Sequence, residues 1–364
     1  MPGRIVLFGA TGYTGRLTAE AMVERGARPV LAARNAERVA AMATELGGLE
    51  HAVADVQDPP SIRALAERGD VLVSTVGPFT LWGAPAVQAA IAAGAAYLDS
   101  TGETPFIRDV FERYGPGAEA AGCGLVTAFG YDWVPGNLAG ALALREAGDA
   151  AVRVDIGYFI TGGGGMSGGT RASAAAVFVA PGYAWRSGQL VTERSAKRLR
   201  TFDVGGGRRE GISVGTSEAF ALPRVHPGLR DVNVYLGWFG GLSRAMQAQS
   251  AILSVLTRIP GVQTGIDGLT SRLVKGSTGG PGPEERAKSG SHIVAIAYDA
   301  GGSELAEVRI AGVDGYTFTG RMLAWGAERA AAEGLRGTGA LGPVEAFGLE
   351  QLEAGAAEAG LKRG

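Results

Sequence analysis

Short apolar runs alternate with amphipathic stretches through the first 130 residues of the chain. The stretches between the runs have the i, i+3, i+4 spacing of helices, and the runs are nearly continuous in their apolar character. Such strands, separated by helices, are typical of a parallel sheet that is covered on both faces. The expected strands are 5–10, 28–34, 51–56, 70–77, 95–101 and 124–130, and the expected helices are 14–26, 36–47, 59–69, 86–94 and 104–115.

From about residue 150 the apolar residues recur with period two, which indicates strands with one packed face and one wet face. Helices at about 168–180 and 243–258 interrupt this pattern, and two glycine-rich stretches, 161–169 and 275–291, are the expected loops. The last 45 residues have the pattern of two helices, which we expect to pack back on the first domain. The expected strands of this second pattern are 151–160, 231–239, 292–300 and 304–312.

The two patterns predict an α/β protein with two domains. Residues 1–132 are expected to form a Rossmann domain, a doubly wound parallel sheet that binds a dinucleotide. Residues 133–334 are expected to form an α+β second domain with a mixed, mostly antiparallel sheet, and helices in 335–364 return to the first domain. A length of 364 residues agrees with two hydrophobic cores.

Composition excludes several classes of function. The 34 basic and 36 acidic residues give a net charge of −2 without charged blocks, so the chain has no electrostatic footprint for nucleic acid. A single cysteine, Cys123, permits no internal disulfide, and the three histidines show no metal-ligand spacing, so we expect no metal. No apolar stretch has the length of a transmembrane span, and no signal peptide is evident, so we expect a cytoplasmic protein.

The sequence GATGYTG, residues 9–15, lies between an apolar strand and an amphipathic helix. Gly9 permits the tight turn, Gly12 permits close approach of a pyrophosphate, and Gly15 permits the helix to pack on its strand. The helix N-terminus then offers N–H donors to the phosphates. A turn that merely packs is the alternative. The predicted cofactor contacts in this turn are Gly9, Thr11, Gly12, Tyr13, Thr14 and Gly15.

The second strand ends in Arg34 and carries no carboxylate of the kind that NAD enzymes use for the ribose hydroxyls. A guanidinium group suits the 2′-phosphate of NADP, so we expect NADP(H) as cofactor, with an exposed strand-end arginine as the alternative. Asp55 follows the third strand, near the expected adenine, although a helix-capping role is also open. The segment after the fourth strand is expected near the nicotinamide ribose and comprises Thr75, Val76, Gly77, Pro78 and Phe79.

The chain lacks the catalytic residues of some classes of dehydrogenase, and this narrows the reactions that it could catalyse. No tyrosine is followed by a lysine four residues later, so the acid pair of short-chain dehydrogenases is missing. Cys123 precedes an apolar strand and is interpreted as a buried small residue rather than a nucleophile. Hydride transfer to an iminium carbon or to a conjugated C=C bond needs less acid assistance than ketone reduction, and such substrates fit this set of residues best.

Motifs along nearly the whole chain resemble the saccharopine dehydrogenase-like oxidoreductases, including the branch of trans-acting enoyl reductases. This resemblance implies an NADP- or NAD-binding Rossmann domain, a second domain for substrate and dimer contacts, and hydride transfer to imines or enoyl double bonds. The family often has Phe-Asp-Ser where this chain has Tyr131, Asp132 and Trp133, so Trp133 is expected to reshape the substrate pocket. The motifs are residues 9–15, 76–103, 130–140, 167–170, 281–290 and 339–352.

Polar residues follow the fifth and sixth strands, at the sheet edge where ligands bind in doubly wound folds. We predict catalytic roles for Tyr131, Asp132 and Glu103. Aromatic packing of Tyr131, capping of the next helix by Asp99 and pairing of Glu103 with Arg108 are the structural alternatives. In the loop at 167–170, helix capping is the alternative. The predicted substrate contacts are Asp99, Thr101, Trp133, Ser167, Gly168, Gly169 and Thr170.

These observations together predict a homodimeric NADPH-dependent oxidoreductase with a small or lipid-like substrate. The apolar stretch 233–259 could face a dimer partner, a lipid or an acyl-carrier protein, with core packing as the commoner explanation. A non-catalytic NADP-binding redox sensor is the alternative from a different class, because a Rossmann domain alone does not name a reaction.

Overall fold

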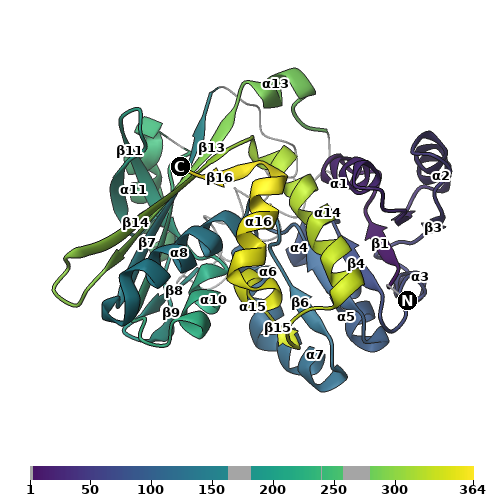
Figure 1. Cartoon of the computed structure of the whole chain (residues 1–364), viewed down its shortest axis with the longest axis horizontal. Helices are drawn as coiled ribbons and strands as arrows, with labels where there is room; N and C mark the ends of the chain where they lie inside the picture. Colours follow the sequence, from purple (N-terminus) through teal and green to yellow (C-terminus); the bar gives the residue numbers. More distant parts are fainter. Residues whose placement is uncertain (1–2, 163–181, 239, 257–278) are drawn as a thin grey trace. The chain divides into compact units, whose positions relative to one another are not determined.

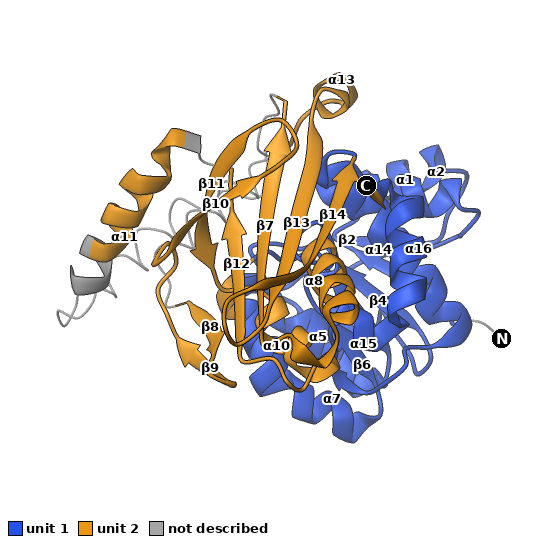
Figure 2. Cartoon of the chain, turned by 60° about the vertical axis from the view of Figure 1, so that its left-hand side comes forward, with its two compact units in different colours: residues 1–102, 106–134, 313–361 blue, residues 103–105, 135–312, 362–364 orange. Residues whose placement is uncertain are grey.

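The computed structural model describes residues 3–162, 182–238, 240–256 and 279–364. The chain divides into two compact units (Figure 2). The first unit comprises residues 1–102, 106–134 and 313–361. The second comprises residues 103–105, 135–312 and 362–364.

Seven parallel strands form the sheet of the first unit, in the order β15-β6-β5-β4-β1-β2-β3 (Figure 1). The chain fills one side of β1 with β2 and β3, and then crosses to β4 on the other side. This arrangement confirms the predicted doubly wound sheet. Its strands are β1 (Ile5–Phe8), β2 (Val30–Ala33), β3 (His51–Val53), β4 (Val71–Ser74), β5 (Ala96–Asp99), β6 (Gly124–Val126) and β15 (Gly339–Ala340).

Helices of the first unit pack in two groups, one made by α1, α14 and α16 and the other by α3, α5 and α7. Strand β4 is buried throughout, and β1, β2 and β5 are mostly buried, which explains their continuous apolar character, whereas the edge strand β3 is partly exposed. The helices are α1 (Tyr13–Glu24), α2 (Ala36–Glu45), α3 (Pro59–Arg63), α4 (Phe79–Trp82), α5 (Ala84–Ala93), α6 (Thr104–Asp109), α7 (Gly115–Ala121), α14 (Gly315–Glu333), α15 (Pro343–Phe347) and α16 (Leu349–Ala359), with a π turn, η1 (Val110–Tyr114), after α6.

The segment that returns to the first unit begins at Val313. The sequence pattern predicts the domain bound at residue 335, although the helical pattern of the last 45 residues is also expected to pack on the first domain. The difference is helix α14, whose apolar face, including Phe318, Met322 and Trp325, is buried. Its Gly320 lies against α1, where an added Cβ would come 3.0 Å from the backbone of Leu17. This close contact makes α14 part of the first hydrophobic core.

The second unit is built on a mixed sheet in the order β10-β11-β12-β7-β13-β14-β16, with β8 and β9 attached beside β12. Strand β12 runs parallel to β7, whereas the β10–β11, β11–β12, β7–β13 and β13–β14 pairs are antiparallel, as predicted. Its strands are β7 (Arg153–Thr161), β8 (Tyr183–Arg186), β9 (Gln189–Thr192), β10 (Leu199–Asp203), β11 (Arg208–Val214), β12 (Asp231–Leu236), β13 (Gly290–Tyr298), β14 (Glu304–Gly312) and β16 (Leu361–Arg363).

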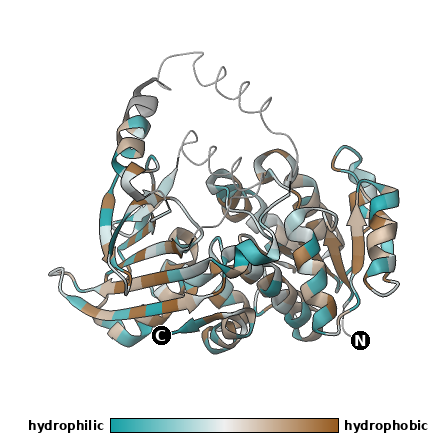
Figure 3. Cartoon of the chain, turned by 90° about the horizontal axis from the view of Figure 1, so that it is seen from above, coloured by the Kyte–Doolittle hydropathy of each residue, from teal (hydrophilic) through white to brown (hydrophobic). Residues whose placement is uncertain are grey.

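Apolar and polar segments alternate along the long strands of this unit (Figure 3), in agreement with the predicted period of two. Helices α8 and α10 cover one face, where a Cβ at Gly140 would lie 3.0 Å from Ile156 Cδ1 and 2.8 Å from Leu222 Cδ1. The described helices and turns are α8 (Val134–Ala147), η2 (Gly148–Ala150), α10 (Glu218–Val225), η3 (Gly240–Leu242), α11 (Ser243–Leu256) and α13 (Pro283–Ala287). The opposite face carries an apolar cluster of Phe159, Phe202, Val204, Tyr235, Val294, Ile296 and Tyr298.

Candidate functional site

The turn after β1 is closed by Gly9, which adopts a left-handed φ of +91°. The Gly9 and Ala10 N–H groups both donate to the Ala32 carbonyl, at 2.8 and 3.1 Å. A Cβ at Gly9 would lie 2.8 Å from Thr75 Oγ1, so a side chain would fill the space between the two loops. Glycine is therefore needed for both the backbone conformation and the close approach.

The same turn leaves the first N–H groups of α1 without a side-chain cap. Gly12 is the N-cap and has extended backbone, and its own N–H donates to the Gly9 carbonyl at 3.0 Å. A Cβ at Gly15 would lie 2.2 Å from the Gly9 oxygen, which is shorter than any permitted contact. The uncapped helix N-terminus and the bare glycine backbone form a cradle that fits a pyrophosphate group.

The point where the strand order reverses lies between β1 and β4. Thr75 follows β4, and its hydroxyl donates to the Phe8 and Gly9 carbonyls at 3.3 and 3.2 Å. The structure thus brings together the glycine turn and the Thr75–Phe79 segment that the sequence assigns to one cofactor site. Within that segment Phe79 is buried and packs on Phe106, with ring centroids 5.5 Å apart, whereas Gly77 is exposed.

Arg34 is exposed at the carboxyl end of β2, and no described residue forms an ion pair with it. The next residue, Asn35, caps α2 by accepting from the Arg38 N–H at 2.8 Å. Asp55 follows β3, and its Oδ1 accepts from the Gln57 N–H at 2.9 Å, which gives this carboxylate a role in its own turn. A cationic strand end with no competing carboxylate fits the extra phosphate of NADP.

The remaining residues of the predicted cofactor turn, Thr11, Tyr13 and Thr14, are partly buried, and Tyr13 and Thr14 begin α1. The ring of Tyr13 contacts the ring of Tyr316 edge-on, with centroids 5.3 Å apart. The carbonyl of Thr14 accepts from the Thr18 hydroxyl at 2.9 Å, and Thr11 precedes the helix. These residues surround the cradle without closing it with a side-chain cap.

Asp99, the last residue of β5, is fully buried. Its Oδ1 accepts from the Thr101 and Ala128 N–H groups, each at 2.9 Å, and its Oδ2 accepts from the Thr127 hydroxyl at 2.8 Å. Burial raises the pKa of Asp99 to about 6, although the hydrogen bonds from Ala128, Thr101 and Thr127 lower it. The carboxylate orders the loops after β5 and β6, and its contact with substrate stays a prediction.

Asp132 follows β6 and differs sharply from Asp99. Its Oδ1 is enclosed and has no hydrogen-bond partner among the described residues, although the residue as a whole keeps some exposed surface. Gly102 lies beside it, because a Cβ at Gly102 would come 2.7 Å from Asp132 Oδ2. Burial alone raises the pKa of Asp132 to about 7. A carboxyl group of this kind exists in both protonation states near neutral pH and can donate or accept a proton.

The neighbours of Asp132 are held by the backbone. The Tyr131 N–H donates to Thr319 Oγ1 at 3.0 Å, and its ring packs over Gly315. The Trp133 N–H donates to the Ala128 carbonyl at 2.8 Å, and both aromatic side chains are buried. The Tyr131 side chain thus takes part in aromatic packing, the structural alternative to a catalytic role. The backbone hydrogen bonds of Tyr131 and Trp133 fix the turn that carries Asp132.

Other predicted site residues are placed as follows. Thr101 is buried in the first unit, and Glu103 is buried as the first residue of the 103–105 segment of the second unit. Ser167, Gly168, Gly169 and Thr170 lie outside the described residues, as does the helix predicted at 168–180.

A buried polar cluster in the second unit was not predicted from the sequence. The Tyr158 hydroxyl donates to Glu218 Oε1 at 2.8 Å and accepts from the Gly136 N–H at 2.6 Å. Asn137, next to Gly136 on α8, donates from Nδ2 to Oγ of Ser217, the N-cap of α10, at 2.9 Å. Glu218 is a fully buried glutamate at the first position of a helix, which is unusual. Its partners are distant in sequence, so no local motif could have predicted this cluster.

Several other classes of site find no support in the part of the chain that is described. Its His, Cys, Asp and Glu side chains form no group of three or more suited to a metal ion. Cys123 is buried, and burial raises the pKa of its thiol, which agrees with the structural interpretation. None of the described helices is long and apolar enough to span a membrane.

Parts of this chain are similar to known proteins. Residues 5–126 match the model of the saccharopine dehydrogenase NADP binding domain, which confirms the predicted NADP(H) cofactor. A Mycobacterium tuberculosis protein provisionally named as a trans-acting enoyl reductase is 42% identical over 179 residues, which cover 46% of this chain and 42% of that protein. A trans-acting enoyl reductase of Mycobacterium leprae is 41% identical over 140 residues, or 37% of this chain and 34% of the relative.

The chain thus spans less than half the length of these relatives. Among solved structures, apo saccharopine dehydrogenase (L-Glu forming) from Saccharomyces cerevisiae superposes with a TM-score of 0.59 over 100% of this chain and 99% of that one, at 13% identity. This likeness shows a shared fold. Residues 5–126, in the first unit, are therefore similar to the saccharopine dehydrogenase NADP binding domain, and part of the chain is similar to proteins named trans-acting enoyl reductases.

Proposed function

We propose that this protein is an NADPH-dependent oxidoreductase that transfers a hydride to an unsaturated carbon of its substrate. The similarity to proteins named trans-acting enoyl reductases supports a conjugated C=C bond as the hydride acceptor. A C=N bond is the second candidate, supported by the match of residues 5–126 to the saccharopine dehydrogenase NADP binding domain.

The observation that carries the proposal is the Asp132 carboxyl group. It lies in the same unit as the NADP-binding turn, its Oδ1 is enclosed without a hydrogen-bond partner among the described residues, and its pKa is raised to about 7. General acids work best when their pKa is close to the working pH. A redox sensor has no need of such a group, so Asp132 favours catalysis.

When bound, NADPH supplies the hydride. The glycine turn and the uncapped start of α1 bind its pyrophosphate, and Arg34 pairs with its 2′-phosphate. Protonated Asp132 donates its proton to the atom next to the carbon that receives the hydride, so that the double bond gains one hydride and one proton. The resulting carboxylate then takes a proton from water, which restores the acid.

Tyr131 and Glu103 have supporting roles in this proposal. Tyr131, packed on Gly315, fixes the backbone before Asp132, and Asp99 orders the loop that brings Gly102 beside it. Glu103, Thr101 and Trp133 are proposed to contact substrate or to order the loops around it. We also propose a homodimer in the cytoplasm, with a small or lipid-like substrate that could be bound to a carrier.

The reaction is tested with two preparations of NADPH, one deuterated at each face of the nicotinamide C4, because an enzyme transfers the hydrogen of only one face. Purified protein is incubated with a panel of enoyl thioesters and imines, and the products are analysed by mass spectrometry. We expect one deuterium at the β-carbon of a reduced thioester. Deuterium only in a reduced imine would select the second candidate. NADPH binding without deuterium transfer to any substrate would favour the redox sensor.

The cofactor assignment is tested separately by titration. Replacing Arg34 with Gln removes the cation at the end of β2 and should weaken NADPH binding by about tenfold or more, with little change for NADH. Arg38→Gln, on the adjacent helix α2, is the matched control. Equal losses for both cofactors would contradict the proposed contact with the 2′-phosphate.

A further inference from the structure

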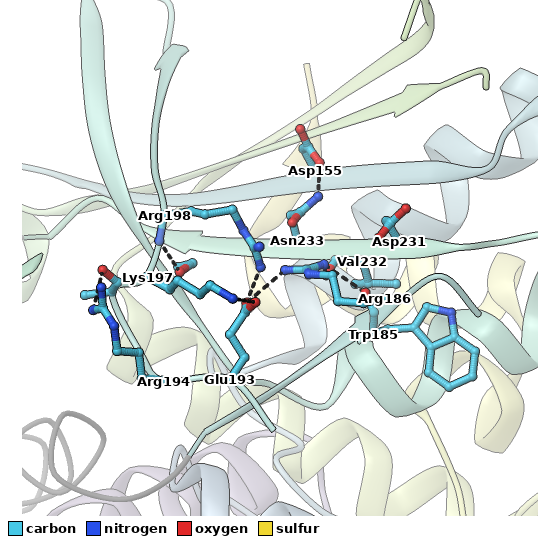
Figure 4. A network of polar contacts seen from close by, with 12 residues as sticks. Asp155, Trp185, Arg186, Glu193, Arg194, Lys197, Arg198, Asp231, Val232 and Asn233 are labelled. Carbon is cyan, nitrogen blue, oxygen red and sulfur yellow. Dashed lines mark hydrogen bonds and ion pairs between the residues drawn. The ribbon is translucent and has the colours of Figure 1, made fainter. Parts of the chain in front are cut away.

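A cluster of charged side chains lies on the sheet of the second unit (Figure 4). Two buried carboxylates, Glu193 and Asp155, form its centres. Five cations surround them, contributed by β7, β8, β10 and the segment after β9: Arg153, Arg186, Lys197, Arg198 and Arg200. The sequence pattern did not predict this cluster, because its members come from β7 and from residues 186–200, which are far apart in the sequence.

Glu193 is contacted by three of the cations. Arg186 Nη2 lies 3.2 Å from Oε1, Lys197 Nζ lies 3.1 Å from Oε2, and Arg198 Nη2 also donates to Oε1. A single carboxylate cannot neutralise three cations. The arrangement is held by the backbone as well, since Arg186 Nη1 donates to the carbonyls of Trp185 and Val232 at 2.8 and 2.7 Å.

Asp155, on β7, is contacted by the other two cations. Arg153 Nε lies 3.5 Å from its Oδ1, and Arg200 Nη1 forms an ion pair with its Oδ2. Asn233 Nδ2 donates to Oδ1 at 2.5 Å. The guanidinium of Arg153 also stacks over the ring of Tyr298, with its carbon 4.1 Å from the ring centroid.

The two centres belong to one cluster, because Arg198 contacts Glu193 and Arg200, two residues further along an extended chain and so on the same side, contacts Asp155. Arg186, which contacts Glu193, also donates to the carbonyl of Val232, whose neighbour Asn233 donates to Asp155. Burial raises the pKa of the Tyr235 hydroxyl, whereas the charges of Arg200, Arg186 and Arg153 lower it. Five cations therefore surround two carboxylates in one place, an excess of three positive charges. Arg194 and Asp231, at the edge of the view in Figure 4, carry opposite charges and leave this excess unchanged.

Three guanidinium groups of the cluster also keep unused donors. The Nε atoms of Arg153, Arg186 and Arg198 are buried and have no hydrogen-bond acceptor among the described residues. Leaving a buried charged donor unsatisfied costs free energy, which an oxyanion would recover. The side chains of these three arginines are 36%, 17% and 34% exposed, so water and ions reach part of each side chain, although the Nε atoms themselves are buried.

We propose that this cluster binds a phosphate group of a ligand. A phosphate dianion offers three acceptor oxygens and reduces the excess charge to a single positive charge, whereas a carboxylate would leave two. Guanidinium forks also match phosphate geometry better than ammonium groups, and four of the five cations are arginines. The proposal is independent of hydride transfer, since it concerns only residues of the second unit.

The test is calorimetric titration of the full-length protein with inorganic phosphate and, in parallel, with acetate at matched ionic strength. The variants Arg198→Gln and Arg153→Gln remove one cation from each centre. Arg244→Gln is the matched control, because Arg244 belongs to the same unit, is 82% exposed and lies 3.6 Å from its partner Glu210. Circular dichroism and urea unfolding show whether each variant is folded.

We expect phosphate to bind the unaltered protein and the Arg244→Gln variant equally, and at least tenfold more weakly to the two cluster variants. Arg34→Gln, in the nucleotide-binding unit, should leave phosphate binding unchanged. Acetate binding as tight as phosphate binding, equal phosphate affinity in Arg198→Gln and Arg244→Gln, or loss of binding in Arg34→Gln alone would each overturn the proposal.

Discussion

Two enclosed carboxyl groups of the first unit, Asp99 and Asp132, and two buried ones of the second, Glu193 and Asp155, have opposite surroundings. In the first unit, Asp99 and Asp132 have no cation beside them, and burial raises the pKa values to about 6 and about 7. In the second unit, Glu193 and Asp155 are each held by two or more cations. The first unit therefore keeps acids that can carry a proton near neutral pH, and the second keeps carboxylates that organise positive charge.

A finer contrast exists within the first unit. Asp99 accepts hydrogen bonds from three donors of the chain, whereas Asp132 Oδ1 accepts none from the described residues. A carboxylate satisfied in this way serves structure, and an enclosed carboxyl that lacks donors has proton transfer as its most direct use. The predictions below test each side of these contrasts.

The largest effect is expected at Asp132. Asp132→Asn keeps the shape of the side chain but removes the proton, so turnover should fall by about a thousandfold, as for loss of a general acid. NADPH affinity, measured by fluorescence titration, should be unchanged. Asp58→Asn is the control, since Asp58 is exposed and its side chain forms no cap on α3. A similar fall in both variants would contradict the catalytic role.

Substitution of Asp99 is expected to lower stability rather than turnover. Asp99→Ala leaves three buried donors unsatisfied and should lower the free energy of unfolding by about 3 kcal/mol, at about 1 kcal/mol for each lost hydrogen bond. Asp99→Asn can still accept at one oxygen, so its loss should be smaller. Urea unfolding measures both. Should the two variants be equally stable, the carboxylate would have no structural role.

The pH dependence of stability separates Asp132 from other acids. Its folded-state pKa of about 7 lies above the ordinary value of 3.8, so the folded state binds this proton more tightly than the unfolded state. The contribution is complete below about pH 4 and is lost as pH rises through 7, at about 1.4 kcal/mol per pH unit. In Asp132→Asn this slope should disappear between pH 4 and 7. Parallel stability curves for the two proteins would refute the raised pKa.

The smallest effect is expected in the second unit. Glu193→Gln removes a carboxylate that competes with a bound anion for Arg186 and Arg198, so phosphate should bind about threefold more tightly, or about 0.7 kcal/mol. The control is Glu210→Gln, whose partner Arg244 lies outside the cluster. Weaker phosphate binding in Glu193→Gln would show that this carboxylate orders the cations more than it competes with the anion.

Local patterns in the sequence predicted the strands that are continuously apolar or strictly alternating. The six strands expected before residue 130 and the four expected after residue 150 all lie at their predicted places, within a few residues. The strands β8, β9, β10 and β11 were not predicted. They carry exposed and charged residues, such as Arg200 and Arg208, so they lack the apolar period that marks a strand.

The sequence predicted which residues lie at the candidate site, but not the role of each carboxyl group in it. Asp99 ends β5 and Asp132 follows β6 of the same parallel sheet, and this placement alone singled them out. Their roles depend on partners such as Thr127 and Ala128, which are 28 and 29 residues from Asp99. The chain brings these groups together only when β5 pairs with β6.

The sequence by itself determined the period of the predicted strands, the glycine turn that we propose binds phosphates and the cation at the end of β2, because each depends on neighbours within one turn or one strand. Tertiary structure decided which carboxyl keeps a proton and which charges gather around Glu193. The physical reason is that burial and charge pairing act between side chains that are close in space, whatever their separation along the chain.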